Sequence, residues 1–254
     1  MNARKGGFTI IEVTLAIAVT GVLAMALLGG WLVNVNTQSY KDSVNTLVSQ
    51  VQQQYDEVYN ISNDRNNAVS CSSGTAATTT NPLRNVGSSN CIILGRYLLL
   101  ANNKMTVRRI VGVEPATLTT QTDDKVAIQS YSPRLITDSD VEQAITYNLA
   151  WGTTLYAPND TAKSPLYRAV AILRSPTSGA VYTYWLPTTA TTTATIAALL
   201  NGNTTTMTAC LQPGATVAMT PLALTIAAKA ANHEAVGTQA FEADAAGGGN
   251  QCAR

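Results

Sequence analysis

The residue in the most unusual chemical surroundings is Glu12, a carboxylic acid near the start of a long apolar run. The run begins at Phe8, and residues 13–33 contain no charged side chain. As an α-helix those 21 residues would extend about 32 Å, which is enough to cross a hydrocarbon core of about 30 Å. A carboxylate inside such a segment is costly, so it is a functional candidate whose partner must be identified. The sequence therefore predicts a membrane-spanning helix in which Glu12 has a specific role.

The peptide bond between Gly7 and Phe8 is the second candidate for chemistry, because it is a predicted cleavage site. An ordinary secretory signal has an apolar core of about 7–15 residues followed by a small-residue cleavage site. Here the apolar run is longer and no such site closes it. Cleavage before the run retains Glu12 and leaves a positive α-amino group on Phe8. We therefore expect residues 1–7 to be a leader peptide and Glu12 to be the fifth mature residue.

The segment Lys5-Gly6-Gly7-Phe8-Thr9-Ile10-Ile11-Glu12-Val13 resembles the prepilin signal of type IV pilins and type II secretion pseudopilins. This resemblance covers about the first 35 residues. It implies cleavage after Gly7 by a prepilin peptidase, N-methylation of Phe8 and assembly into a helical filament with other pilin subunits. Many pilins have a kinking proline near the outer membrane boundary, where this chain has Gly29-Gly30.

For Glu12 we expect a register role in assembly. Its carboxylate would neutralise the α-amino group of Phe8, most effectively that of a neighbouring subunit. Such a pair would fix the axial offset of each new helix in a filament core from which water is excluded.

The basic pair Arg4 and Lys5 predicts the orientation, because positive charge stays on the cytoplasmic side. We expect residues 8–35 to form the transmembrane and filament-core helix, and residues 36–254 to form an extracytoplasmic domain. The protein would be a single-pass membrane protein, with a pilus or pseudopilus as its final location. The formal net charge is +1, or −1 in side chains once the leader is removed, so a nucleic-acid partner is not expected.

Four cysteines lie in the outer part: Cys71, Cys91, Cys210 and Cys252. An even number in an exported domain indicates disulfides, and four cysteines allow three connectivities. We favour the local pairs Cys71–Cys91 and Cys210–Cys252. A zinc site is the alternative, but there is no C-x-x-C pair and only one histidine, His233. We expect no metal and no cofactor.

The usual enzyme motifs are absent, including G-x-S-x-G, H-E-x-x-H, the P-loop and G-x-G-x-x-G. The sequence therefore predicts a structural subunit rather than an enzyme, a minor pilin or pseudopilin. "Minor" follows from the length of 254 residues, which is long for a main building block. The alternative is a membrane-anchored surface binding protein, an adhesin or DNA receptor, that does not polymerise.

The helix is predicted to continue beyond the membrane to Tyr59. After residue 39 its apolar residues recur at gaps of three and four and form one stripe, which a sheet must cover. Strands are predicted at residues 97–100, 105–113, 125–131, 167–173, 181–186, 216–226 and 235–241. A short helix is predicted at residues 141–149, because Ser139 and Glu142 have capping-box spacing. A long helix followed by an antiparallel sheet is an α+β order, and the resemblance implies the same pilin-like architecture.

Overall fold

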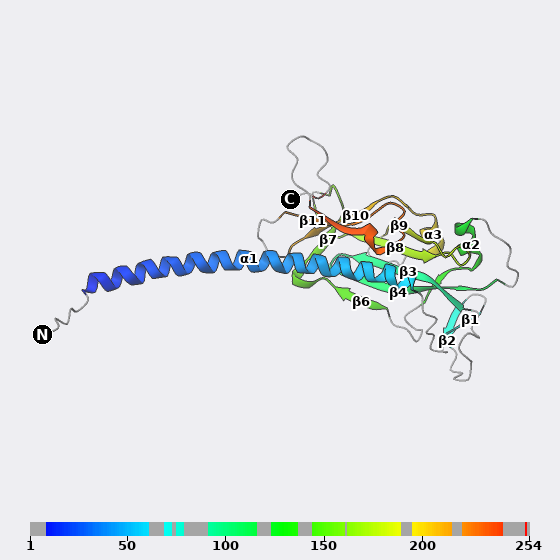
Figure 1. The fold of residues 1–254 in the computed structure, drawn as a ribbon, viewed down its shortest axis with the longest axis horizontal. Coiled ribbons are helices and arrows are strands. Elements are labelled where there is room, and N and C mark those ends of the chain that lie inside the picture. Colours follow the sequence, from blue (N-terminus) through cyan, green and yellow to red (C-terminus); the bar gives the residue numbers. More distant parts are fainter. Residues whose placement is uncertain are drawn as a thin grey trace.

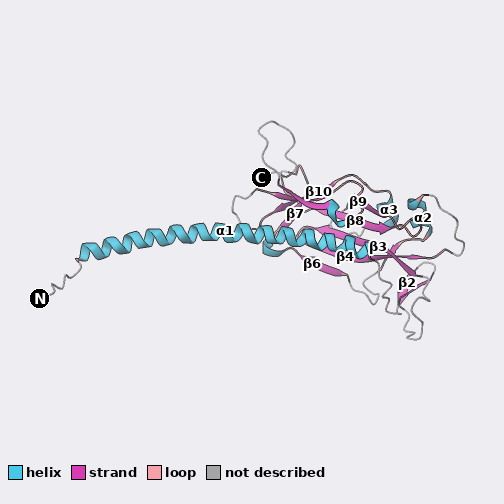
Figure 2. Cartoon of the chain, in the orientation of Figure 1, coloured by secondary structure: helices cyan, strands magenta, loops and turns pink. Residues whose placement is uncertain are grey.

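The computed structural model describes residues 9–60, 69–72, 75–78, 91–115, 123–136, 144–160, 162–188, 195–214, 220–240 and 252. One long helix leads into a globular part built mainly from antiparallel strands (Figure 1). The fold is therefore α+β, as the sequence predicts. The N-terminal half of the helix extends away from the globular part as a straight projection (Figure 2).

The long helix α1 spans Ile10–Tyr59, with Thr9 as its N-cap residue. The Gly29-Gly30 pair lies inside the helix without ending it. At the other end, the backbone N–H of Asn60 donates to the Asp56 carbonyl at 2.8 Å, and Arg174 Nη1 donates to the Tyr59 carbonyl at 3.2 Å. These two donors satisfy carbonyls that the end of a helix leaves without partners. The predicted end at Tyr59 is confirmed.

The larger sheet has six antiparallel strands, in the order β5-β4-β3-β8-β9 with β6 also paired to β4. They are β3 (Cys91–Ala101), β4 (Lys104–Val113), β5 (Arg134–Leu135), β6 (Ile145–Asn148), β8 (Tyr167–Arg174) and β9 (Val181–Pro187). Four of the predicted strands lie within β3, β4, β8 and β9. Asn102 in the β3–β4 turn has a φ of 50°, a conformation that asparagine adopts more readily than most residues.

The smaller sheet has four strands in the order β12-β11-β10-β7, again all antiparallel. They are β7 (Thr154–Tyr156), β10 (Met207–Gln212), β11 (Leu222–Ile226) and β12 (Val236–Ala240). The strands β11 and β12 lie within the last two predicted strand segments. A separate hairpin pairs β1 (Val69–Ser72) with β2 (Thr75–Thr78).

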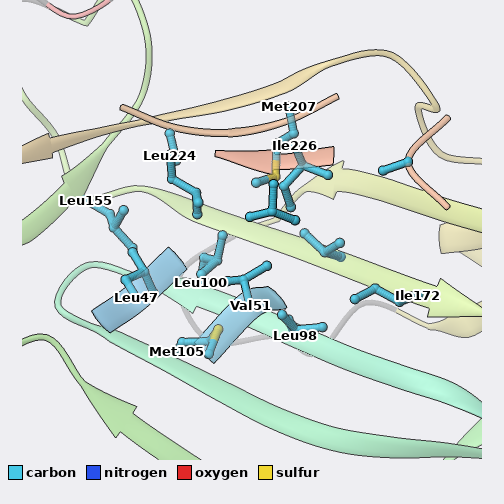
Figure 3. Packing of buried hydrophobic residues seen from close by; sticks show 14 of the residues in the cluster. Leu47, Val51, Leu98, Leu100, Met105, Leu155, Ile172, Met207, Leu224 and Ile226 are labelled. Atoms are coloured by element: carbon cyan, nitrogen blue, oxygen red, sulfur yellow. The ribbon is translucent and has the colours of Figure 1, made fainter. Parts of the chain in front are cut away.

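The main core lies where α1 packs against both sheets (Figure 3). Leu47 and Val51 of α1 meet Leu98 and Leu100 of β3 on one side and strands of the smaller sheet on the other. The smaller sheet contributes Met207, Leu211, Leu224 and Ile226. The larger sheet alternates along β3, as a strand with two covered faces must, because Tyr97 points to the opposite face from Leu98.

That opposite face is covered by two short helices, α2 (Asp124–Ser130) and α3 (Ile196–Leu200). Ile128 from α2 and Leu199 from α3 pack there against residues of β3, β4, β8 and β9. The larger sheet is thus enclosed on both sides, by α1 and the smaller sheet on one and by α2 and α3 on the other. Two short 3₁₀ segments, η1 (Ala150–Gly152) and η2 (His233–Ala235), complete the described elements.

Two predicted elements are wrong. Residues 125–131 were expected to be a strand, but they lie almost entirely in α2, because Asp123 caps a helix there by accepting from the backbone N–H of Lys125 at 2.8 Å. Residues 141–149 were expected to be a helix, but β6 occupies 145–148 and pairs with β4. The predicted cap of that helix, Ser139 and Glu142, lies outside the described residues.

Candidate functional site

The projecting half of α1 is the part of the described chain with the most unusual exposure. Every residue from 10 to 35 is exposed, and these residues include most of the large apolar side chains that the structure leaves uncovered. Ile10 is 83% exposed, Val22 68% and Trp31 64%. The helix is long and apolar enough to cross a membrane by length and composition. An apolar surface of this extent, on all sides of a helix, needs lipid or other helices around it.

The two threonines within this segment, Thr14 and Thr20, bond to their own helix. The hydroxyl of Thr14 donates to the Ile11 carbonyl at 3.0 Å, and that of Thr20 donates to the Ala16 carbonyl at 2.8 Å. Threonine can therefore enter an apolar environment without an external partner. Glu12 is then the one charged side chain between Thr9 and Tyr40.

Glu12 forms a capping box with Thr9 at the start of α1. Its Oε2 accepts from the backbone N–H of Thr9 at 2.9 Å and from the Thr9 hydroxyl at 3.1 Å, while the Glu12 N–H donates to Thr9 Oγ1 at 3.3 Å. The sequence analysis missed this bond, although the Thr9-x-x-Glu12 spacing is its signature. In the single chain the carboxylate thus stabilises its own helix N-terminus through Oε2.

The predicted processing residues, Gly7 and Phe8, lie outside the described residues. A pair between the Glu12 carboxylate and the Phe8 α-amino group therefore stays a prediction. The capping box is compatible with it, because both hydrogen bonds to the carboxylate use Oε2. The Oε1 atom makes no hydrogen bond to any described residue and could accept a second donor.

Two tyrosines fix the other half of α1 to the globular part. The Tyr40 hydroxyl donates to the Leu211 carbonyl and accepts from the backbone N–H of Leu222, both at 2.9 Å, so it joins the helix to β10 and β11. The Tyr55 hydroxyl lies 2.8 Å from Thr183 Oγ1, which in turn donates to the Ala230 carbonyl. Burial raises the pKa of Tyr40 to about 12 and raises the pKa of Tyr55 further.

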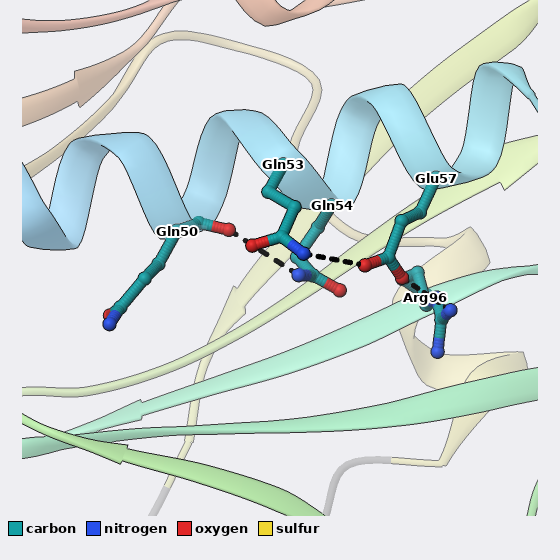
Figure 4. A network of polar contacts seen from close by, with 5 residues as sticks. All are labelled: Gln50, Gln53, Gln54, Glu57 and Arg96. Carbon is teal, nitrogen blue, oxygen red and sulfur yellow. Dashed lines mark hydrogen bonds and ion pairs between the residues drawn. The ribbon is translucent and has the colours of Figure 1, made fainter.

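An ion pair adds to this attachment at the far end of α1 (Figure 4). Glu57 pairs with Arg96 of β3, and Gln53 Nε2 donates to Glu57 Oε1 at 3.0 Å. Gln54 is 1% exposed although its residue type predicts an outer position, and its amide donates to the Gln50 carbonyl at 3.4 Å. No sequence signal identified Arg96 as the partner of Glu57, because the pairing depends on how the helix crosses the sheet.

His233, the single histidine of the sequence, is exposed at the start of η2. Its Nδ1 lies 2.8 Å from Asp56 Oδ1 of α1, and nearby Gln52 donates to the Val236 carbonyl at 3.0 Å. These contacts attach η2 and β12 to the helix. They leave His233 with a structural role in the described part of the molecule.

The cysteines fall into two groups. Cys210 and Cys252 form a disulfide with a Cα–Cα distance of 5.5 Å, the pairing that the sequence analysis favoured. Cys252 is buried beside Tyr156 and Ala223, so the bond attaches the C-terminal end of the chain to the smaller sheet. Cys71 lies in β1 and Cys91 begins β3, but their side chains are outside the described part, and their predicted pairing stays a prediction.

The acidic pair Asp123 and Asp124 is occupied by local hydrogen bonds. Asp123 caps α2, and Asp124 accepts from the hydroxyls of Ser175 at 2.6 Å and Tyr182 at 2.5 Å. These bonds, led by the one from Ser175, lower the pKa of Asp124 to about 2. No group of three or more His, Cys, Asp or Glu side chains within the described ranges could hold a metal ion.

An open hollow of about 580 Å³ lies at the end of the globular part where α1 finishes. It is bordered by the β8–β9 turn, including Arg174 and Ser175, and by the start of β3. The Ser175 hydroxyl is engaged by Asp124, and Arg174 bonds to the Tyr59 and Gly179 carbonyls. The main polar groups of the hollow are thus used to hold the fold together.

Comparison of the chain with protein-family models, with characterised proteins and with solved structures gave no match. The functional assignment therefore rests on the chain itself: the Gly7-Phe8 junction, Glu12, and a long helix of which one half is fully exposed and the other half is built into the globular part.

Proposed function

We propose that this protein is a structural subunit of a type IV filament, a minor pilin or pseudopilin. In this proposal a prepilin peptidase cuts after Gly7 and Phe8 is N-methylated. The exposed half of α1 anchors the mature subunit in the membrane until the subunit is added to a helical fibre. The globular part lies on the extracytoplasmic side. No cofactor and no catalytic residue are involved.

The observation that carries the proposal is the uncovered apolar surface on all sides of residues 10–35, with one carboxylate near its start. Lipid would cover this surface before assembly, and the equivalent helices of other subunits would cover it afterwards. Such an exchange has a small hydrophobic driving force, because lipid tails are as apolar as leucine side chains. Specific polar contacts must then decide which helices associate and in what register.

Glu12 supplies such a contact in the proposed filament. Its Oε2 stays in the capping box with Thr9, and its Oε1 accepts from the α-amino group of a neighbouring subunit's Phe8. The bond would neutralise two charges that the water-free core would otherwise hold separately. Because Glu12 is fixed to its own helix start, the contact would also set the axial offset between neighbouring helices.

The N-terminus of the mature protein provides the direct test. Mass spectrometry should find methylated Phe8 as the first residue when the protein is isolated from cells that carry a prepilin peptidase. A Gly7→Val variant should accumulate as uncut precursor in the membrane, because a side chain at Gly7 obstructs the approach of the backbone to the peptidase. Ala3→Val is the matched control, since it places the same valine side chain in the leader but away from the cleaved bond between Gly7 and Phe8.

Two results would contradict the proposal. Mature protein of normal length from Gly7→Val would show that the cleavage site is wrong. Retention of Met1 in the wild-type protein, together with its absence from sheared filament fractions, would favour the anchored surface binding protein that does not polymerise.

A further inference from the structure

The segment η1 exposes a tryptophan at one end of the globular part. Trp151 is 67% exposed, the largest value for a large hydrophobic residue beyond residue 35 in the described chain. Its backbone is left-handed, with a φ of 58° and a ψ of 28°, and Gly152 follows with a φ of 67°. A bulky residue with positive φ is unusual and persists where its surroundings impose it.

The surroundings of Trp151 do impose this conformation. Ser43 Oγ of α1 donates to the Ala150 carbonyl at 3.1 Å, and the backbone N–H of Thr153 donates to the same carbonyl at 3.1 Å. Gly214 packs so closely that a Cβ atom there would lie 2.6 Å from the Trp151 carbonyl oxygen. The indole is therefore presented to solvent by a fixed loop.

The position of this loop suggests what the indole meets. Ser43 belongs to the first turn of α1 that is buried against the globular part, so η1, which it contacts, lies at the end of the globular part from which the helix projects. From Val35, the last residue of the exposed segment, to Ser43 is about 12 Å along the helix axis. The headgroup layer of a bilayer is about 5–8 Å thick on each side. The distance from Val35 to Ser43 exceeds the thickness of this layer, and a helix tilt of about 20° together with the length of the indole makes up the difference.

The side chains around η1 suit a lipid surface. Tryptophan is enriched at membrane interfaces, where its ring is among apolar chains and its N–H remains in a polar layer. Lys104 is exposed at the same end, since it begins β4 opposite Asn148, three residues before Trp151. Lys41 of α1 is exposed at the same level, with Asp42 as a counter-charge. The two ammonium groups can meet lipid phosphates.

We propose that Trp151 inserts into the phospholipid headgroup layer of the membrane that α1 spans. This second contact fixes the tilt and rotation of the globular part relative to the bilayer before the subunit leaves it. The inference rests on the membrane insertion in the proposed function, but it does not require filament assembly.

The test uses the full-length chain in vesicles of phosphatidylethanolamine and phosphatidylglycerol, with tryptophan fluorescence as the readout. The Trp31→Phe variant retains Trp151 and Trp185, and the difference from Trp31→Phe/Trp151→Phe isolates the emission of Trp151. We expect lipids brominated near the headgroup to quench this emission more than lipids brominated deep in the chain. We also expect iodide to quench it about threefold less in vesicles than in detergent, as for an interfacial indole.

A matched control places a tryptophan at the opposite end of the globular part. Tyr59 is 66% exposed there, so Tyr59→Trp in the Trp31→Phe/Trp151→Phe background should remain accessible to iodide and unaffected by brominated lipid. Trp151 behaving in the same way as this control would overturn the inference. Protection from iodide without quenching by brominated lipid would also overturn it, because the indole would then contact another protein copy.

The fluorescence of Trp31 reports membrane insertion independently of Trp151. In the Trp151→Phe variant, brominated lipid should quench Trp31, and bromine in the upper part of the chain should quench it more than bromine near the chain end, because Trp31 lies in the apolar helix only four residues before Val35. Quenching of Trp31 without quenching of Trp151 would refute the headgroup contact alone. Loss of both would refute the membrane insertion on which the proposed function depends.

Discussion

The two halves of α1 form one continuous helix but differ in what covers them. Residues 10–35 are all exposed, whereas Tyr40, Val44, Leu47, Val51, Tyr55 and Val58 are each at most 4% exposed. The first half is apolar around its whole circumference, and the second has one apolar stripe with glutamines and acids on its other faces. A stripe can be satisfied by one sheet surface, but a fully apolar helix needs apolar surroundings on every side. The difference indicates that folding of the single chain covers the apolar stripe of the second half, while the first half requires lipid or other helices around it.

The largest expected effect separates charge from capping at Glu12. Glu12→Val and Glu12→Gln should both insert in the membrane and be cleaved. Only glutamine retains an acceptor for the Thr9 N–H, and neither retains the charge. If the charge sets subunit register, both variants should fall at least about tenfold in sheared filament fractions, relative to their amounts in membranes.

Two other outcomes are informative for Glu12. A defect in Glu12→Val alone would assign the role to the capping box. Wild-type incorporation of both variants would exclude any register role for this residue.

The next effect concerns the disulfide, which should stabilise the globular part and not the projecting helix. It closes a loop with a sequence separation of 42, worth about 4 kcal/mol in the chain-entropy model. The double variant Cys210→Ala/Cys252→Ala should therefore lower the free energy of unfolding of the globular part in urea. Circular dichroism in detergent should show that helix from residues 10–35 persists through this transition. An unchanged midpoint would contradict the role of the bond.

A pair of leucine variants compares the two halves of α1 directly. Leu47 is 1% exposed and Leu23 is 57% exposed. Leu47→Ala should lower the free energy of unfolding of the globular part by about 3 kcal/mol, because it leaves a cavity in the main core. Leu23→Ala removes the same atoms from a surface that no described residue covers, so the denaturant midpoint should not move. Equal losses from the two variants would show that the halves are energetically coupled.

Alkaline pH should weaken the packing of the second half of α1 against the globular part and leave the first half unaffected. This effect is negligible at neutral pH. An unfolded tyrosine titrates near pH 10, whereas burial raises the pKa of Tyr40 to about 12. The neutral phenol is thus favoured in the folded state. Its contribution is complete below about pH 10 and is lost as pH rises towards about 12, so the free energy of unfolding should fall over that interval.

The Tyr40→Phe variant provides the control for the alkaline effect. It loses the bonds to Leu211 and Leu222 and should be less stable at neutral pH, but its stability should decline less between pH 10 and 12. A decline as steep as in the wild-type protein would assign the alkaline sensitivity to other groups. The projecting segment contains no tyrosine or lysine, so its helix content should not change over this pH range.

Local sequence patterns identified the elements that depend on residues close together in the chain. The apolar periodicity placed the end of α1 at Tyr59, and β-branched runs placed β3, β4, β8 and β9. The wrong secondary-structure predictions are at segments whose conformation depends on the elements packed or paired with them. Residues 125–131 have strand-forming side chains, but Asp123 caps a helix that covers the larger sheet. Residues 145–148 became a strand because the edge of β4 offered backbone partners.

By itself the sequence determined that α1 would have two unlike halves, because charge and apolar spacing are properties of the chain. It also placed Glu12 at the start of the apolar run and favoured the bond between Cys210 and Cys252. Only the tertiary structure decided the contacts between distant residues, such as Glu57 with Arg96, Asp56 with His233, and Tyr40 with the β10–β11 pair. These depend on the crossing of helix and sheets, which local spacing does not encode. The exposure of Trp151 was decided in the same way, since packing against Ser43 and Gly214 imposes its left-handed backbone.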